Sequence, residues 1–263
     1  MPELPDVETF KRYLDATSLH QRIEEVDVRS VYVLKGVSAA ELARRLEGRR
    51  FKSSRRHGKH LFVSTNRKNW LRLHFGMTGS LHYFKGKEQA PPHTRVLFVF
   101  DEDCRLAFDD PRKFGEIGLV DDVDEFLKRR VLGPDALDVD LAEFRNLLAN
   151  HRGAIKAAVL NQRVIAGIGN IYADEILFRA RIHPATQISA LDKKALTTLF
   201  RATRYILKKA IVAKVDVDRM PKSWLLPHRG KGGKCPRCGR DLKSATIGGR
   251  TAWFCAHCQN RAS

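Results

Sequence analysis

The sequence lacks any apolar run that could cross a membrane, and no apolar segment follows its start. A membrane-spanning helix needs about 20 consecutive apolar residues, and no such run occurs among the 263 residues. A secretory signal needs an apolar stretch near the N-terminus. In this sequence, charged residues interrupt the N-terminal segment at Glu3, Asp6, Glu8, Lys11 and Arg12. We therefore expect a protein that has no membrane partner, is not secreted and works in the cytoplasm.

Acidic residues are scarce toward the C-terminus. The chain has 48 Lys and Arg against 30 Asp and Glu, a net charge of +18. Residues 201–263 alone hold fifteen basic residues and three acidic ones, which accounts for +12 of that charge. Because a cationic segment displaces the condensed counterions of a polyanion, this excess favours binding to nucleic acid. The charge alone leaves RNA and DNA as alternatives.

Cysteine is also rare, and four of the five cysteines lie close together in the sequence. Cys104 stands alone in a strand-like segment, whereas Cys235, Cys238, Cys255 and Cys258 have the spacing C-x2-C-x16-C-x2-C. Each C-x2-C pair places two thiolates on one tight turn, and two pairs complete a tetrahedron around Zn2+. Two disulfides are the alternative, which the absence of a secretory signal disfavours. Since four protein ligands leave no position for water, we predict one structural zinc ion.

The pattern of apolar residues predicts an α+β fold. Pro5 and Asp6 suit the first turn of a helix, and Val7, Phe10 and Leu14 continue it at helical spacing to about residue 18. Short runs rich in Val, Phe and Leu follow to about residue 120, which predicts a two-layer β-sandwich or a barrel. The later segments that read as helix are 141–150, 153–160, 170–180 and 189–213.

The break at Gly133-Pro134 is the predicted boundary between the two kinds of structure. We predict an N-terminal β-sandwich domain over 1–133 and a helical domain over 134–217. A basic linker and the zinc finger would then occupy 218–263.

Two glycine turns are predicted to present groups that bind phosphate. "GIGN" at 167–170 precedes a helix, so its backbone N–H groups and the Asn170 side chain would lie at the positive end of the helix dipole. A dinucleotide-binding site would require a strand before the glycines, and this pair follows a helical stretch. In the finger, "TIGGRTAW" predicts a β-hairpin with Arg250 at its tip, where an arginine is suited to a phosphate.

Three motifs in this order resemble the formamidopyrimidine-DNA glycosylase / endonuclease VIII family of base-excision repair enzymes. They are "MPELPDVE" at the start, "GIGNIYADE" in the middle and the finger that ends "GRTAWFCAHCQ". The resemblance covers the whole chain. It implies an N-terminal helix and β-sandwich, a helix–two-turn–helix (H2TH) domain and a C4 zinc finger. It also implies a monomeric enzyme whose partner is double-stranded DNA containing a damaged base or an abasic site.

The resemblance gives catalytic roles to Pro2 and Glu3 in the N-terminal domain. Once Met1 is removed, the secondary amine of such a proline attacks C1′ of the damaged nucleotide and expels the base. An α-amine titrates near pH ~8, so a useful fraction is nucleophilic at neutral pH. The resulting iminium ion promotes β- and δ-elimination, and Glu3 resembles the acid/base that helps to open the sugar. Lys59 in "RRHGKHLFV" resembles the β-hairpin lysine that contacts phosphates beside the lesion, and we count it with the catalytic group.

Four further positions resemble DNA contacts of the family. His74 in "LHFGMTGSL" resembles a phosphate contact. Met77 in the same motif, with Arg112 and Phe114 in "DDPRKFGE", resembles the trio that fills the space left in the duplex by a flipped nucleotide. This trio favours the formamidopyrimidine branch of the family over the endonuclease VIII branch.

The sequence departs from the family pattern at two places. Asp6 stands where the family usually has glutamate, and segment 214–234 is shorter than the loop that closes over 8-oxoguanine in the formamidopyrimidine branch. The preferred substrate therefore stays open: oxidised pyrimidines, ring-opened purines and abasic sites are the alternatives. Two other functions also stay open: a DNA-binding protein that keeps the clamp without the chemistry, and a zinc-ribbon RNA-binding protein, which does not account for the start of the chain.

Overall fold

Two compact units make up the protein, and each is described by itself. The structure, a computed structural model, describes residues 1–67 and 69–259. The first unit comprises Met1–Pro2 and Asp6–Val131, and the second comprises Glu3–Pro5 and Leu132–Ser263. The last four residues of the predicted finger domain lie outside the described residues. Among the helices that are described, none is long and apolar enough to cross a bilayer.

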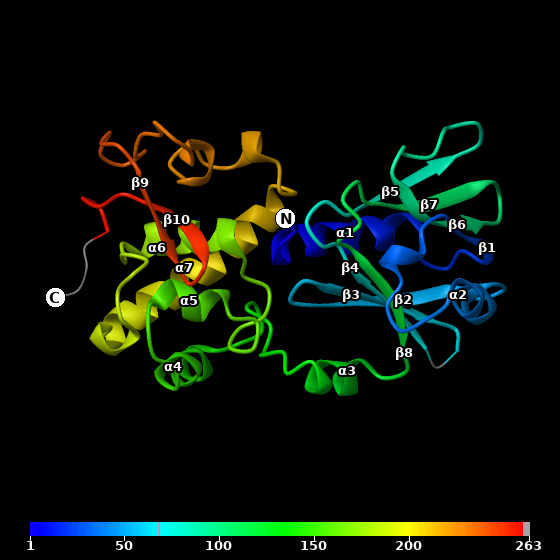
Figure 1. The fold of residues 1–263 in the computed structure, drawn as a ribbon, viewed down its shortest axis with the longest axis horizontal. Coiled ribbons are helices and arrows are strands. Elements are labelled where there is room, and N and C mark those ends of the chain that lie inside the picture. The colour runs from blue at the N-terminus through cyan, green and yellow to red at the C-terminus, as the bar shows by residue number, and fades with distance from the viewer. Residues whose placement is uncertain (68, 260–263) are drawn as a thin grey trace. The chain divides into compact units, whose positions relative to one another are not determined.

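The first unit contains two antiparallel four-stranded sheets and three helices (Figure 1). The strand order is β1-β6-β7-β5 in one sheet and β2-β3-β4-β8 in the other. The helices are α1 (Leu4–Thr17), α2 (Ala39–Leu46) and α3 (Val123–Arg129), with a 3₁₀ turn η1 (Val31–Val33). The strands are β1 (Ile23–Val28), β2 (Phe51–His57), β3 (His60–Thr65), β4 (Trp70–His74), β5 (Ser80–Lys85), β6 (Thr94–Phe100), β7 (Cys104–Asp109) and β8 (Glu116–Val120). The β-sandwich prediction is therefore confirmed.

The core of the first unit lies between these sheets, because both send apolar side chains inward. Phe51 of one sheet packs its ring edge-on against Phe98 and Phe100 of the other, with both centroid pairs 5.9 Å apart. The predicted helix α1 adds Val7 and Leu14 to the same buried cluster. Figure 1 shows α1 running alongside the strands. Burying such side chains supplies the main driving force for this arrangement.

Two elements differ from the expected run of strands between residues 18 and 120. Helix α2 was not expected, although Ser38 and Glu41 match the spacing of a capping box. The Ser38 hydroxyl accepts a hydrogen bond from the Glu41 backbone N–H at 3.1 Å, and Leu42 and Leu46 are buried. Strand β2 was also missed, since "FKSSRRH" is polar and its residues after Phe51 are half-buried or exposed. Its pairing with β3 holds it in the sheet.

The second unit is helical and carries a small two-stranded sheet (Figure 1). Its helices are α4 (Leu141–Ala149), α5 (Ile155–Leu160), α6 (Asn170–Ala180) and α7 (Lys193–Val212), with 3₁₀ turns η2 (Ile188–Ala190), η3 (Val217–Arg219) and η4 (Leu226–His228). Its strands are β9 (Lys243–Ile247) and β10 (Arg250–Phe254). The predicted helix over 189–213 instead begins at Lys193, because the Asp192 side chain caps it by accepting from the Ala195 N–H at 2.6 Å.

The basic segment before the cysteines is irregular, as expected, but it is packed against the helices. Met220, Trp224 and Leu225 in this segment are buried, and Met220 and Trp224 belong to the same apolar cluster as α6 and α7. Leu225 instead contacts the finger cluster through Phe178 and Cys235. The segment therefore joins the helices to the finger.

Candidate functional site

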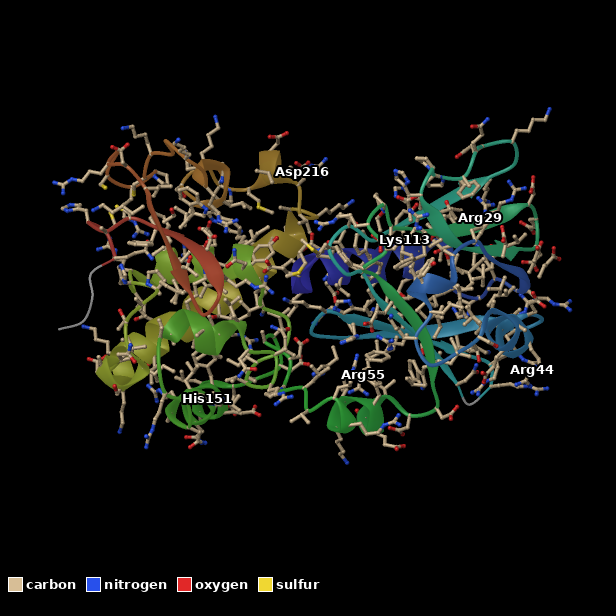
Figure 2. All side chains as sticks on the ribbon, in the orientation of Figure 1. Arg29, Arg44, Arg55, Lys113, His151 and Asp216 are labelled. Carbon is tan, nitrogen blue, oxygen red and sulfur yellow. The ribbon has the colours of Figure 1, made fainter. Side chains whose placement is uncertain are left out.

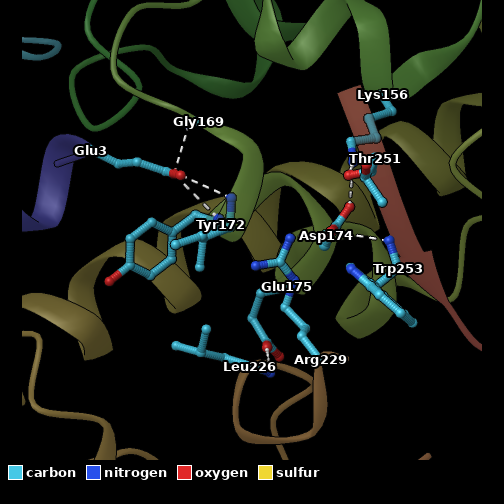
Figure 3. A network of polar contacts seen from close by, with 11 residues as sticks. Glu3, Lys156, Gly169, Tyr172, Asp174, Glu175, Leu226, Arg229, Thr251 and Trp253 are labelled. Carbon is cyan, nitrogen blue, oxygen red and sulfur yellow. Dashed lines mark hydrogen bonds and ion pairs between the residues drawn. The ribbon is translucent and has the colours of Figure 1, made fainter. Parts of the chain in front are cut away.

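Glu3 is held at the beginning of α6. Its side chain is buried, and its two carboxylate oxygens accept hydrogen bonds from the N–H groups of Gly169 at 2.7 Å, Ile171 at 2.8 Å and Tyr172 at 3.2 Å (Figure 3). Helix N-termini bind anions through such free N–H groups and the helix dipole. The glycine turn therefore is an anion site, as the sequence predicts, but its anion is a carboxylate of this chain.

The two glycines of this turn are required by the close approach of residues 3 and 4. A Cβ on Gly169 would lie 2.3 Å from the Glu3 carboxyl carbon, and one on Gly167 would lie 2.5 Å from a methyl carbon of Leu4. Gly167 also has a φ of +112°, which favours glycine. The Leu4 N–H donates to the Gly167 carbonyl at 3.0 Å. The segment that follows Pro2 is thus anchored at two consecutive residues.

Asn170, the first residue of α6, keeps one oxygen without a partner. Its side-chain Oδ1 is buried and makes no hydrogen bond with any residue that the structure describes. A buried acceptor of this kind costs free energy unless a ligand or water satisfies it. Its role as a DNA contact stays a prediction.

In the first unit, Lys59 and His74 belong to neighbouring strand ends of one sheet. Lys59 lies in the two-residue turn between β2 and β3, where Gly58 has a φ of +55°. His74 ends β4, and His60 of β3 pairs with it in register, with ring centroids 4.8 Å apart. The sheet hydrogen bonding thus brings these groups together, although they are 15 positions apart in the sequence.

Both histidines in this cluster are held neutral. Burial lowers the pKa of His74 to about 4, and nearby cations, Arg72 and Lys59 among them, act in the same direction. Burial also lowers the pKa of His60 well below its usual range. The Gly76 N–H donates to Nδ1 of His74 at 3.1 Å, so the proton of the neutral ring resides on Nε2. His74 is therefore a neutral hydrogen-bond donor.

Met77, Arg112 and Phe114 lie on two adjoining turns of the first unit. A Cβ on Gly76 would lie 2.3 Å from the Phe114 backbone, which shows how closely the turns pack. The Arg112 guanidinium lies 4.8 Å from the Phe114 ring centre, and the Arg112 N–H donates to Thr78 at 3.3 Å. Met77 is 41% exposed and Phe114 is 52% exposed. Two large apolar side chains are thus exposed on adjoining turns, and their role as DNA contacts stays a prediction.

The four C-terminal cysteines converge as their spacing predicts. Their sulfur atoms all lie within 4.8 Å of one another, with Cys235–Cys258 at 3.9 Å and Cys238–Cys255 at 3.6 Å. Zinc–thiolate bonds of about 2.3 Å in a tetrahedron place sulfurs about 3.8 Å apart. The cluster therefore fits one zinc ion. All five cysteines are free thiols, so the alternative of two disulfides is not adopted.

A buried polar network attaches the finger hairpin to α6 (Figure 3). Lys156 donates to Asp174 at 2.6 Å, and both side chains are fully buried. Asp174 also accepts from Arg229 at 2.8 Å and from the Trp253 N–H at 3.1 Å, and Lys156 donates to the Thr251 carbonyl at 2.9 Å. These contacts fix β10, whose first residue is the exposed Arg250 beside the Gly248–Gly249 turn.

Several of these groups cannot be found from the sequence by inspection. Asp174 lies within the quoted motif "GIGNIYADE", yet nothing local marks it as the partner of Lys156, 18 residues earlier. Glu175 beside it is buried, accepts from the Leu226 N–H at 2.8 Å, and has a pKa raised by burial to about 7. The sequence would indicate these buried contacts only if Asp174 and Glu175 were both recognised as lying on the inner face of α6.

Comparison with known families accounts for nearly the whole chain. The N-terminal domain of formamidopyrimidine-DNA glycosylase matches residues 1–117, and the H2TH domain of the same enzyme matches residues 132–220. A zinc finger found in formamidopyrimidine-DNA glycosylase and isoleucyl-tRNA synthetase matches residues 232–261.

Individual proteins match this chain over nearly the full length of both partners. The formamidopyrimidine-DNA glycosylase of Pelotomaculum thermopropionicum is 33% identical over 98% of this chain and 99% of its own. That of Desulfitobacterium hafniense is 35% identical over 98% of this chain and its full length. The wild-type Lactococcus lactis enzyme, solved with DNA containing an N7-benzyl formamidopyrimidine, superposes with a TM-score of 0.88 at 28% identity, covering 99% of this chain and all of that one. A MutM complex with DNA containing carbocyclic 8-oxoguanine gives a TM-score of 0.90 at 30% identity over 99% of this chain.

Proposed function

The chain belongs to the formamidopyrimidine-DNA glycosylase family, and from that premise we propose a bifunctional DNA glycosylase and abasic-site lyase that removes oxidised or ring-opened bases. The observation that carries the proposal is the anchoring of Glu3 and Leu4 on the glycine turn before α6. This anchoring holds the backbone directly after Pro2, as a nucleophile at residue 2 requires. The enzyme acts as a monomer on double-stranded DNA in the cytoplasm.

The reaction uses the amine of Pro2 after Met1 has been removed. The amine nitrogen forms a bond to C1′, and the bond from C1′ to the base breaks with its electrons leaving on the protonated base. Opening of the sugar ring yields an iminium ion, which remains cationic because the amine is secondary. Loss of a proton from C2′ then expels the 3′-phosphate, and loss of a proton from C4′ expels the 5′-phosphate. Water hydrolyses the remaining iminium and restores the amine.

In this reaction Glu3 provides a fixed negative charge next to the nucleophile. Three N–H donors and the positive end of α6 stabilise its carboxylate. A carboxylate held in this way favours positive charge developing at C1′ and at the iminium nitrogen. The acid/base role in sugar opening that the resemblance assigns to Glu3 stays part of this proposal.

The DNA contacts follow from the chemistry of each group. Lys59 supplies a positive charge to phosphates beside the lesion, whereas His74 donates a hydrogen bond from a neutral ring, since its pKa is lowered to about 4. Asn170 and Arg250 bind further phosphates from the second unit. Met77, Arg112 and Phe114 enter the duplex where the nucleotide has left it; the two apolar side chains provide stacking surface and the guanidinium provides hydrogen bonds.

The four cysteines hold one structural zinc ion. Their four thiolates would fill every coordination position of the zinc ion, which would support the hairpin that carries Arg250 and leave no position for a reacting water. The Gln259 side chain supports the finger by accepting from the Cys255 N–H at 2.9 Å and donating to the Ile182 carbonyl at 3.0 Å.

We further propose a weak preference for 8-oxoguanine relative to ring-opened purines and abasic sites. Segment 214–234 is short, and part of it is held in place by packing and pairing. Trp224 and Leu225 are buried, and Arg229 is paired with Asp174. These contacts shorten the length of chain that is free to form a loop over a flipped purine.

Borohydride trapping tests the proposal. Duplexes carrying an abasic site, a formamidopyrimidine, 8-oxoguanine or an oxidised pyrimidine are incubated with protein whose N-terminus is shown by mass spectrometry to be Pro2. We expect a covalent protein–DNA adduct with the abasic and formamidopyrimidine duplexes, and a weaker one with 8-oxoguanine. Pro2→Gly should lose strand cleavage while its affinity for an abasic-site analogue stays within about threefold, because a glycine changes no DNA contact.

A proline elsewhere provides the control. Pro91→Gly, in a loop of the first unit, should trap DNA as the unaltered protein does. If verified Pro2 protein forms no adduct on any duplex but still binds abasic-site DNA, the protein is a DNA-binding member of the family without the chemistry. If it binds neither, the proposed function is wrong altogether.

A further inference from the structure

Four arginines line one small hollow in the first unit. Arg44 and Arg45 belong to the last turn of α2, Arg49 follows that helix, and Arg67 lies between β3 and β4. Together with Asn69 they surround a cavity of about 240 Å³. Figure 2 labels Arg44 at the end of α2. A site of this size admits a phosphate group but is smaller than typical small-molecule pockets of about 300–1,000 Å³.

Of these guanidinium groups, only that of Arg45 is neutralised by carboxylates of the described residues. Arg45 pairs with Asp121 at 2.7 Å and with Glu41 at 3.9 Å. Within residues 1–67 and 69–259, neither Arg44, Arg49 nor Arg67 forms an ion pair, and Nε of Arg49 is buried without a hydrogen-bond partner. The negative end of the α2 dipole favours cations in its last turn, but it does not account for Arg49 and Arg67.

The hollow is remote from the proposed contact at Lys59. Strands β2 and β3 pair from Phe51↔Thr65 at one end to His57↔His60 at the other. Lys59 lies in the turn at the second end, whereas Arg49 and Arg67 flank the first. A seven-residue strand spans about 20 Å, so these arginines cannot reach the phosphates that Lys59 contacts. Figure 1 shows this hairpin running from its turn toward α2.

From these observations we propose that Arg44, Arg45, Arg49 and Arg67 form a second phosphate-binding site that holds the backbone of a separate DNA segment. Guanidinium groups match phosphate oxygens with paired N–H donors. A duplex offers one charge per about 1.7 Å of its length, so it can satisfy three unpaired cations together. The proposal rests on the proposed function only in that the protein meets DNA.

A protein with two such sites passes from one DNA segment to another through an intermediate bound to both. Free competitor DNA then accelerates its departure from the first segment, whereas a protein with one site leaves at a rate that the competitor does not change. This behaviour would let the enzyme move between distant stretches of undamaged DNA without being released.

The test uses a labelled undamaged duplex, so that it does not depend on cleavage. Stopped-flow dissociation is measured with rising concentrations of unlabelled duplex, always in excess over protein. For the unaltered protein we expect the dissociation rate to rise about threefold or more across the series. For Arg44→Ser/Arg67→Ser we expect a rate independent of competitor, with equilibrium affinity for a short lesion duplex unchanged. Both side chains are exposed, so the variant should fold.

A matched variant controls for the loss of two charges. Lys87→Ser/Lys128→Ser removes two exposed cations of the same unit outside the hollow and should keep the competitor dependence. The proposal is overturned if the arginine variant keeps that dependence, or if the unaltered protein shows none. Inorganic pyrophosphate tests whether the hollow binds a small phosphate-containing anion instead of DNA. If it stabilises the unaltered protein but not the arginine variant against heat, while competitor dependence is absent, the hollow binds a small anion and not DNA.

Discussion

Several charged groups of the second unit are buried and paired, whereas two proposed contact residues of the first unit, Met77 and Phe114, are exposed. In the second unit, Lys156 and Asp174 are fully buried, and Glu3 is satisfied by three backbone donors. In the first unit, Phe114 and Met77 are about half exposed. A buried ion pair is costly to break but adds little net stability when intact. The buried groups of the second unit are therefore fixed in position, whereas Met77 and Phe114 of the first unit are available to a partner.

The largest effect should come from losing the finger of the second unit. Cys255→Ser removes one of four zinc ligands, and structural zinc sites are a major part of the folding free energy of such fingers. We expect zinc content to fall below one per chain and affinity for lesion DNA to decline at least tenfold, as measured by atomic emission and fluorescence anisotropy.

Cys104→Ser, the same substitution in the first unit, is the control for Cys255→Ser. Its thiol is buried in β7 and donates to the Glu102 carbonyl, a contact that a hydroxyl can keep. We expect full zinc content and DNA affinity from this variant. Unchanged DNA binding by zinc-free Cys255→Ser would mean that the finger hairpin holds its shape without metal.

The next effect compares a buried ion pair with an exposed one. Asp174→Asn leaves Lys156 buried without its counter-charge, which should lower the free energy of unfolding of the second unit by about 3–5 kcal/mol. Asp124→Asn in the first unit breaks a pair with Arg55, 2.8 Å long, whose side chains are 65% and 44% exposed. Exposed pairs contribute little, so we expect no resolvable change. Denaturant unfolding followed by tryptophan fluorescence measures both, and equal effects would remove the distinction between the units.

The two units should also respond to pH in opposite directions. Burial raises the pKa of Glu175 from 4.5 to about 7. Between these pH values the Glu175 carboxyl is ionised in the unfolded state but still protonated in the native state. The free energy of unfolding therefore falls as pH rises through this window, by about 3 kcal/mol in all. For His74 the native pKa is lowered from 6.5 to about 4, so stability falls as pH drops from 6.5 to 4.

Two variants separate these contributions. Glu175→Gln should flatten the loss between pH 4.5 and 7, and His74→Gln should flatten the loss between pH 6.5 and 4. The measurement is the free energy of unfolding of each variant against that of the unaltered protein at half-unit pH intervals. Parallel curves for Glu175→Gln and the unaltered protein would show that this carboxyl does not titrate there.

The smallest effect on stability should accompany a clear effect on binding. Phe114→Ala and Met77→Ala remove exposed side chains, so each should change the free energy of unfolding by less than about 0.5 kcal/mol. Loss of base stacking should nevertheless weaken binding to a lesion duplex by about tenfold. Anisotropy titrations with lesion and undamaged duplexes measure the difference. Large destabilisation by either variant would mean that these residues belong to the core.

Much of the fold follows from local patterns in the sequence. Helix α6 begins and ends at the predicted residues, because the glycine turn before it and the apolar spacing within it act locally. The cysteine cluster also follows from spacing alone. Strand β2 does not, because its polar residues carry no alternating signal and its position depends on pairing with β3.

The candidate site is predicted less completely, since its contacts join distant parts of the chain. The sequence indicates that the turn before Asn170 binds an anion, and the resemblance assigns catalysis to Glu3. Neither reveals that the Glu3 carboxylate occupies that turn. The partners of Lys156 and the group of four arginines likewise arise from tertiary packing, which no periodicity in the sequence reports.

The docking of Glu3 has a consequence for the order of events during synthesis. Gly169, its first donor, lies 166 residues further along the chain. At about 5–20 residues per second, a ribosome needs roughly 8–33 seconds to add that length. Until then the carboxylate has no helix to cap, and the residues before it remain accessible to the aminopeptidase that the proposed mechanism requires to expose Pro2. The contact that we propose fixes this amine therefore forms late enough to leave time for Met1 to be removed.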